Sequence, residues 1–256
     1  MLDKIKNLFD YRKIPFLLSF DKNGIAIKLQ ERLIQLQKDI YNLDKYLEST
    51  WDIEPNQLAT YWQPIHESMT SLGVESKEHK TYLSLIKRYQ EHELGLRNNA
   101  FTIFSSLGFY YYYKSCDVKL IRKLLFEHIP NLAEDMDLAD WLYFDLITEI
   151  NDDIADIQED KDVLNGNAFV LKSNLNGIEA TYNEYVAFLK NIQNKNNSKR
   201  YIASNAERSA IYEWTDEACN ATLALLKSQK IEIENDSTLI DQNKIIEHLA
   251  LLEKTN

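Results

Sequence analysis

DWLYFDLITEINDDIADIQED, residues 140–160, is the most unusual stretch of the sequence. At about 100° per residue, its acidic positions fall on one face of a helix and its apolar positions on the opposite face. The acidic face holds Asp145, Glu149, Asp152, Asp156 and Glu159, flanked by Asp153 and Asp160; the apolar face holds Tyr143, Leu146, Ile147, Ile150, Ile154 and Ile157. This pattern predicts one long helix over residues 137–160, which ends before the turn signal Asn165-Gly166.

The acidic face is costly for an isolated helix. Aspartate is a poor interior helix residue because its side chain competes for backbone groups, and like charges one turn apart repel each other. The face carries no lysine or arginine, since the first basic residue is Lys161. A divalent cation would relieve the repulsion, because Mg²⁺ takes one or two carboxylates together with substrate phosphates. The alternative interpretation is an ordinary solvated face, which surface helices commonly have opposite an apolar one.

Outside this stretch, the sequence reads as consecutive amphipathic helices. The chain has 256 residues, of which 45% are hydrophobic, and it contains only 6 Gly and 4 Pro. So few turn residues argue against sandwiches, barrels and propellers. We expect an all-α fold, a single-domain bundle of about nine helices over residues 1–256. The expected helices cover residues 25–49, 56–71, 77–96, 97–115, 117–128, 137–160, 176–193, 201–230 and 239–253, with an N-terminal arm over 1–24 and a long loop over 161–175.

Charge and composition restrict the partners. Lys and Arg number 29 against 40 Asp and Glu, giving a net charge of −11, so we expect no nucleic-acid partner. No apolar run reaches 18 residues, which predicts no integral membrane segment. The N-terminus is not a convincing signal peptide, and Cys116 and Cys219 form no CxxC pair. We therefore expect a cytoplasmic protein.

The string ITEINDDIADIQED, followed by NGN, resembles the second aspartate-rich region of class I isoprenoid (terpenoid) synthases. In the trans-prenyltransferase frame, Asp152, Asp153 and Asp156 fill the three acidic places of DDxxD. In the terpene-cyclase frame, Asn151 and Glu159 match, while Ala155 stands where a hydroxyl is expected. The squalene/phytoene-synthase frame fits as well, through Asp156, Glu159 and Asp160. Three overlapping fits indicate the superfamily and leave the subfamily open.

The resemblance implies a helical bundle that ionises a prenyl diphosphate with Mg²⁺, as a terpene cyclase or a prenyltransferase. It implies a metal site in which a first acidic motif lies opposite the second one, and basic groups that bind the diphosphate. Arg97, Asp152 and Asp156 would be catalytic, and aromatic rings such as Phe101, Phe104 or Tyr111 would face the allylic cation. The implied metal ligands are Asp44, Glu48, Asp152, Asp153, Asp156 and Glu159, and the implied diphosphate-binding residues are Arg97, Arg200 and Tyr201.

The first acidic motif departs from the family pattern. The stretch KDIYNLDKYLES, residues 38–49, offers Asp39, Asp44 and Glu48 but no DDxxD, and it lies closer to Asp152 than is usual. Lys45 is an ordinary salt-bridge partner for these acids. The alternative function is therefore a non-catalytic helical interaction protein, a diverged relative without a complete first metal site. A homodimer is an open alternative to a monomer.

Other enzyme classes have no support in the sequence. A di-iron carboxylate bundle needs Glu-x-x-His pairs, and none of the five histidines has a glutamate three residues before it. No G-x-S-x-G, P-loop or Rossmann glycine pattern occurs. Each histidine is most simply a structural or surface residue.

Overall fold

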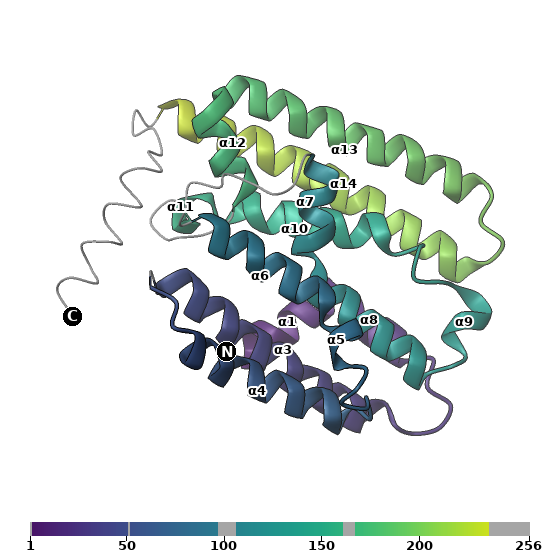
Figure 1. The fold of residues 1–256 in the computed structure, drawn as a ribbon. Helices are drawn as coiled ribbons and strands as arrows, with labels where there is room; N and C mark the ends of the chain where they lie inside the picture. Colours follow the sequence, from purple (N-terminus) through teal and green to yellow (C-terminus); the bar gives the residue numbers. More distant parts are fainter. Residues whose placement is uncertain (1, 51, 97–105, 161–166, 236–256) are drawn as a thin grey trace. The chain divides into compact units, whose positions relative to one another are not determined.

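The computed structural model describes residues 2–50, 52–96, 106–160 and 167–235. Within these ranges every regular element is an α-helix and there is no strand, which confirms the predicted all-α class. The helices, α1 to α14, are more numerous than predicted (Figure 1). None of the helices in the described ranges is both long enough and apolar enough to cross a membrane.

The helices divide between two compact units. The first comprises residues 1–91 and 116–138, and the second comprises residues 92–115 and 139–256. Helix α6 (Ser84–Leu96) contributes its first residues to the first unit and its last residues to the second. A single domain over residues 1–256 stays a prediction.

In the first unit, the long helices α3 and α4 lie side by side (Figure 1). Leu36 and Leu43 of α3 and Ile65 and Met69 of α4 are buried. Burying a side chain of this size stabilises the fold by about 1.5–3 kcal/mol. Besides the start of α6, the helices of this unit are α1 (Leu2–Tyr11), α2 (Ile14–Leu18), α3 (Ala26–Ser49), α4 (Pro55–Ser71), α5 (His79–Tyr82), α8 (Cys116–His128) and α9 (Leu132–Asp135).

A buried charge ties three segments of the first unit together. Asp117 of α8 accepts hydrogen bonds from Arg12, which follows α1, and from Gln37 of α3, both at 2.8 Å. Burial alone would raise the pKa of Asp117, but Arg12 and Gln37 hold it below its ordinary value. The ion pair therefore stays charged inside the unit.

In the second unit, α14 packs against both α10 and α13, and α12 packs on α13 (Figure 1). The core consists of Ile147, Ile150 and Ile154 of α10, with Leu189 of α13 and Leu226 of α14. Besides the end of α6, the helices of this unit are α7 (Leu107–Lys114), α10 (Leu142–Ala155), α11 (Ile157–Asp160), α12 (Ala168–Asn176), α13 (Ile178–Tyr201) and α14 (Ala206–Asn235).

Several boundaries differ from the predicted ones. The predicted arm over 1–24 contains α1 and α2, whose residues Ile5, Phe9 and Leu17 are buried. Within the predicted loop over 161–175, residues from Ala168 onward form α12, and residues 161–166 lie outside the described ranges. The long acidic helix divides at Asp156 into α10 and α11. The predicted helix over 239–253 also lies outside the described ranges.

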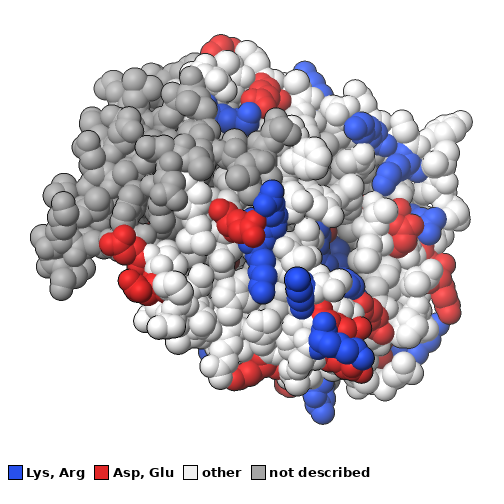
Figure 2. Space-filling view, in the orientation of Figure 1, with Lys and Arg blue, Asp and Glu red and all other residues white. Residues whose placement is uncertain are grey.

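Charges of both signs occupy the surface. On the face drawn in Figure 2, lysine and arginine side chains lie among aspartate and glutamate side chains. The expectation of no nucleic-acid partner rests on the net charge and stays a prediction.

Candidate functional site

The acidic side chains of α10 do not share one environment. Asp145 and Glu149 are buried, as is Asp153, which is only 1% exposed. Asp152 is exposed, and Asp156, which caps the helix, is half-buried. The apolar residues on the other side of α10 are also buried, so most of this helix is enclosed. Only its last turn presents carboxylates to solvent.

Asp153 is enclosed by donors from two other helices, α7 and α12. Its Oδ2 accepts a hydrogen bond from the Tyr111 hydroxyl at 2.7 Å and one from the backbone N–H of Ala168 at 3.2 Å. Its Oδ1 forms an ion pair with Lys114 Nζ. The Tyr111 hydroxyl also shares a 2.7 Å hydrogen bond with the Tyr185 hydroxyl of α13. The network thus joins α7, α10, α12 and α13.

The electrostatics of this network keep Lys114 charged. Burial alone would lower the pKa of Lys114, but the Asp153 carboxylate raises it well above its ordinary value. Burial raises the pKa of Asp153, against Lys114 and Tyr111, which lower it. Burial, together with the charge of Lys114, lowers the pKa of His92 to about 4, so that ring is neutral. We take the Lys114–Asp153 pair as ionised, because both charges are compensated at close range.

The side chain of Asn167 links the acidic motif to the start of α12. Its Nδ2 donates to the backbone carbonyl of Asp153 and to Oδ2 of Asp160, both at 2.7 Å. Its Oδ1 accepts from the backbone N–H groups of Phe169 and Val170, which is the N-cap arrangement for α12. Burial raises the pKa of Asp160 to about 7, so its carboxyl titrates near neutral pH.

The predicted first acidic motif lies on α3, in the first unit. Asp44 and Glu48 stand one turn apart and are half-buried. Asp39 is buried and accepts hydrogen bonds from Ser68 Oγ at 2.6 Å and from Gln35 Nε2 at 2.8 Å, so it fastens α3 to α4. These acids and the α10 cluster belong to different units.

Two of the predicted diphosphate-binding residues, Arg200 and Tyr201, are not brought to the α10 carboxylates. Arg200 pairs with Glu213 at 2.5 Å and Asp216 at 3.7 Å, and Tyr201 is 93% exposed. The neighbouring Lys199 donates to the carbonyl of Ala139, which precedes α10. Residues 199–201 therefore lie near the start of α10, and Leu142 and Asp152 are roughly 15 Å apart along that helix.

Other predicted residues lie outside the described ranges. Arg97, Phe101 and Phe104 fall within residues 97–105, and the side chain of Glu159 is not described either. Tyr111 is described, but its hydroxyl is bound to Asp153. Lys114 and Asn167 were not predicted as site residues. Asn167 does carry a sequence signal, because an asparagine directly before the apolar run AFVL is typical of a helix N-cap.

Two carboxylates, those of Asp152 and Asp156, stand at the end of α10. Among the described residues, no group of three or more His, Cys, Asp or Glu side chains could hold a metal ion. Asp152 and Asp156, one turn apart, offer two carboxylates. Mg²⁺ characteristically uses one or two carboxylates and completes its shell with water and substrate phosphates. These two residues therefore fit the magnesium that the family resemblance implies.

No protein-family model, curated protein or solved structure matches this chain.

Proposed function

We propose that this protein is a Mg²⁺-dependent class I isoprenoid synthase, which ionises a prenyl diphosphate as a terpene cyclase or prenyltransferase. One observation carries the proposal: at the end of α10 Asp152 is exposed and Asp156 is half-buried, while Asp153 between them is enclosed by Lys114 and Tyr111. The enclosed carboxylate fixes the rotation of the helix, so the other two keep a defined position. The terpenoid-synthase-like class of the all-α fold is part of the same proposal.

Each residue has a separate task in this proposal. Asp152 and Asp156 would hold Mg²⁺, which when bound supplies Lewis-acid stabilisation of the diphosphate leaving group. Asp153 acts as a positioning residue, because its oxygens are engaged by Lys114, Tyr111 and Ala168. Asp160 carries a proton at its carboxyl below about pH 7, and its ionisation adds a negative charge beside the pair.

A second candidate function is the non-catalytic helical interaction protein. The Lys114–Asp153 ion pair favours it, because the middle carboxylate of the motif has its own cation within the protein. In this alternative the acidic motif maintains the packing of α7, α10 and α12 and binds no substrate.

Thermal unfolding separates the two functions. If the synthase is correct, Mg²⁺ and pyrophosphate together should stabilise the full chain, whereas each alone should have little effect. At ligand concentrations about 100 times the Kd, the stabilisation is about 2.7 kcal/mol, or roughly 5–10 °C in Tm. The release of pyrophosphate from prenyl diphosphates of several chain lengths should depend on Mg²⁺.

Paired substitutions test the residues. Asp152→Asn with Asp156→Asn should abolish both the joint stabilisation and the pyrophosphate release. Glu207→Gln with Glu217→Gln is the matched control, because it removes the same charge from α14 in the same unit. Joint stabilisation that survives in the Asp152/Asp156 variant removes these residues from the proposal. No joint stabilisation and no release in the unmodified chain would establish the non-catalytic alternative.

A further inference from the structure

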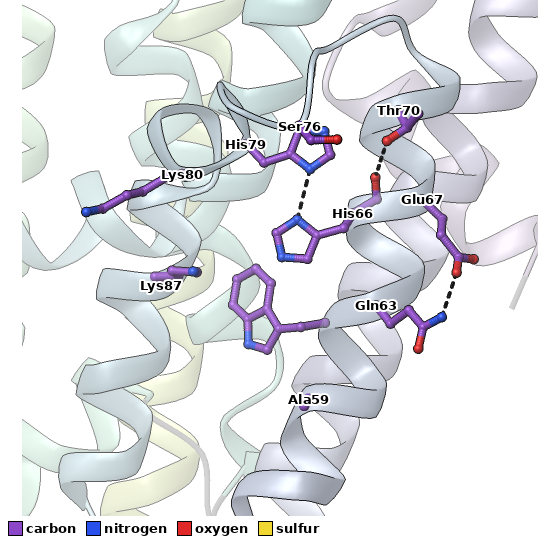
Figure 3. A pocket seen from close by; sticks show the side chains of 10 residues that line it. Ala59, Gln63, His66, Glu67, Thr70, Ser76, His79, Lys80 and Lys87 are labelled. Atoms are coloured by element: carbon purple, nitrogen blue, oxygen red, sulfur yellow. Dashed lines mark hydrogen bonds between the residues drawn. The ribbon is translucent and has the colours of Figure 1, made fainter.

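A cavity of about 680 Å³ lies in the first unit beside α4 and α5 (Figure 3). Trp62 and His66 of α4 line it, together with His79 of α5 and the lysines Lys80 and Lys87. Figure 3 shows the two imidazole rings turned toward each other at the centre of this group. Nothing in the proposed function uses these residues, and all of them belong to the first unit.

The two histidines meet through their Nδ1 atoms. The nitrogens are 3.0 Å apart, the ring planes differ by 9°, and the ring centroids are 5.2 Å apart. A ring N–H points along the plane of its ring, so a hydrogen bond between nearly parallel planes places the rings edge to edge. The Nδ1 lone pair of one ring therefore faces the Nδ1 position of the other, with a single proton between them.

A backbone carbonyl sets the orientation of His79. Its Nε2 donates to the carbonyl oxygen of Val74 at 3.1 Å, which leaves Nδ1 as the acceptor. Gly73, at φ 83°, makes the turn after α4 that presents this carbonyl. Histidines that bind metals commonly donate their second ring N–H to a backbone carbonyl in this way, because it fixes the tautomer and the ring orientation.

We propose that the Nδ1 atoms of His66 and His79 form a binding site for a divalent transition-metal ion of the class that prefers imidazole, represented by Zn²⁺. Two bonds of about 2.0–2.1 Å at a tetrahedral angle need nitrogens about 3.3 Å apart. The observed pair, at 3.0 Å, has to open by a few tenths of an ångström, and the rings also have to turn, so that the two Nδ1 lone pairs converge on the ion. The proton on Nδ1 of His66 moves to its Nε2, so both Nδ1 lone pairs become available and no net proton is released.

Charged and polar groups surround the two histidines. Burial, His79 and Lys87 lower the pKa of His66. Glu67 is exposed and accepts from Gln63 at 2.9 Å, and it points away from the pair (Figure 3). The remaining ligand positions face the cavity and take water or a small anion, because the positive charges of Lys80 and Lys87 oppose the dication alone and favour an anion bound with it.

Zn²⁺ titration of the full chain, in competition with a chromophoric chelator, tests the site. We expect one saturable site in the unmodified protein. Losing an outer-shell partner alone costs about 10- to 100-fold in metal affinity, so His66→Gln and His79→Gln should each weaken Zn²⁺ binding at least tenfold. His128→Gln is the matched control, because His128 lies on α8 of the same unit and bonds to Leu124. It should leave the affinity unchanged.

Nitrogen NMR of the histidine rings in the unmodified protein keeps the test independent of how the variants fold. One equivalent of Zn²⁺ should shift the Nδ1 signals of two histidines and leave the Nε2 proton of His79 in place. The proposal is overturned if Zn²⁺ does not bind, if it binds equally well without His66 and His79, or if it leaves both Nδ1 signals unmoved.

Discussion

The carboxylate of Asp153 is enclosed and still charged, because Lys114, Tyr111 and the backbone N–H of Ala168 surround it. Such a pair stabilises little compared with apolar packing, but removing one partner leaves a buried charge unopposed. Asp153 is thus the residue of the acidic motif with the strictest structural demand.

Lys114→Met should therefore destabilise the protein strongly. We expect a loss of about 3–5 kcal/mol in the free energy of unfolding, because Asp153 then lies buried without its cation. Adding Asp153→Asn should recover part of this loss. Lys172→Met is the control, since the Lys172–Glu184 pair is partly exposed and should contribute at most about 1 kcal/mol. Urea unfolding measures all four proteins, and equal losses for the two lysine variants would contradict the buried pair.

Asp160→Asn should remove a pH dependence of stability. The carboxyl has a pKa of about 7 when folded and near 3.9 when unfolded. The folded state therefore holds an extra proton between these values, so the stability of the natural chain falls as pH rises toward 7 and stays level above it. An asparagine carries no such penalty. The free energy of unfolding of Asp160→Asn, relative to that of the natural chain, should therefore rise by about 2–3 kcal/mol between pH 5 and pH 8.

Urea unfolding at several pH values measures this difference. Asp152→Asn is the control, because it removes a carboxyl of the same motif that is exposed at the end of α10. A constant difference between Asp160→Asn and the natural chain from pH 5 to 8 would rule out the raised pKa.

At the scale of the helix, α12 depends on its first cap. Asn167 caps two backbone N–H groups and also bonds to the carbonyl of Asp153 and to the Asp160 side chain. Asn167→Ala should cost about 1–2 kcal/mol for the cap, and more because two further buried acceptors lose their donor. Asn167→Asp should restore the cap but place a negative charge against Asp160. The order of stability should be Asn, then Asp, then Ala at acid pH, and unfolding curves at pH 5 measure it.

Hydrophobic periodicity predicted the helices whose apolar face is packed along its whole length. The predicted helices over 25–49, 56–71 and 117–128 correspond to α3, α4 and α8 within one or two residues. The predicted break at the polar stretch over 194–200 is wrong, because α13 continues to Tyr201. Asn196 is buried there and donates to the carbonyl of Tyr212 and to Asp216 of α14, so a polar residue supplies the packing contact.

The candidate site was only partly predictable for a similar reason. The motif locates Asp152 and Asp156 on a helix, because their spacing is local. Lys114 pairs with Asp153 across 39 residues, and the contact between His66 and His79 depends on how the chain turns at Gly73. Contacts of this kind follow from tertiary packing, which a local pattern does not specify.

At the scale of the whole molecule, the two proposed sites lie in different compact units. Their ligands should therefore protect different segments from amide exchange. Ligands slow amide exchange where they oppose local opening. Mg²⁺ with pyrophosphate should protect the end of α10 and the start of α12, whereas Zn²⁺ should protect α4 and α5. Hydrogen–deuterium exchange with mass spectrometry resolves these segments. Protection of α10 by Zn²⁺ would place that ion on the acidic cluster and remove the histidine site. Protection by Zn²⁺ that is confined to α4 and α5 would leave the carboxylates to Mg²⁺, the harder cation, which prefers oxygen ligands.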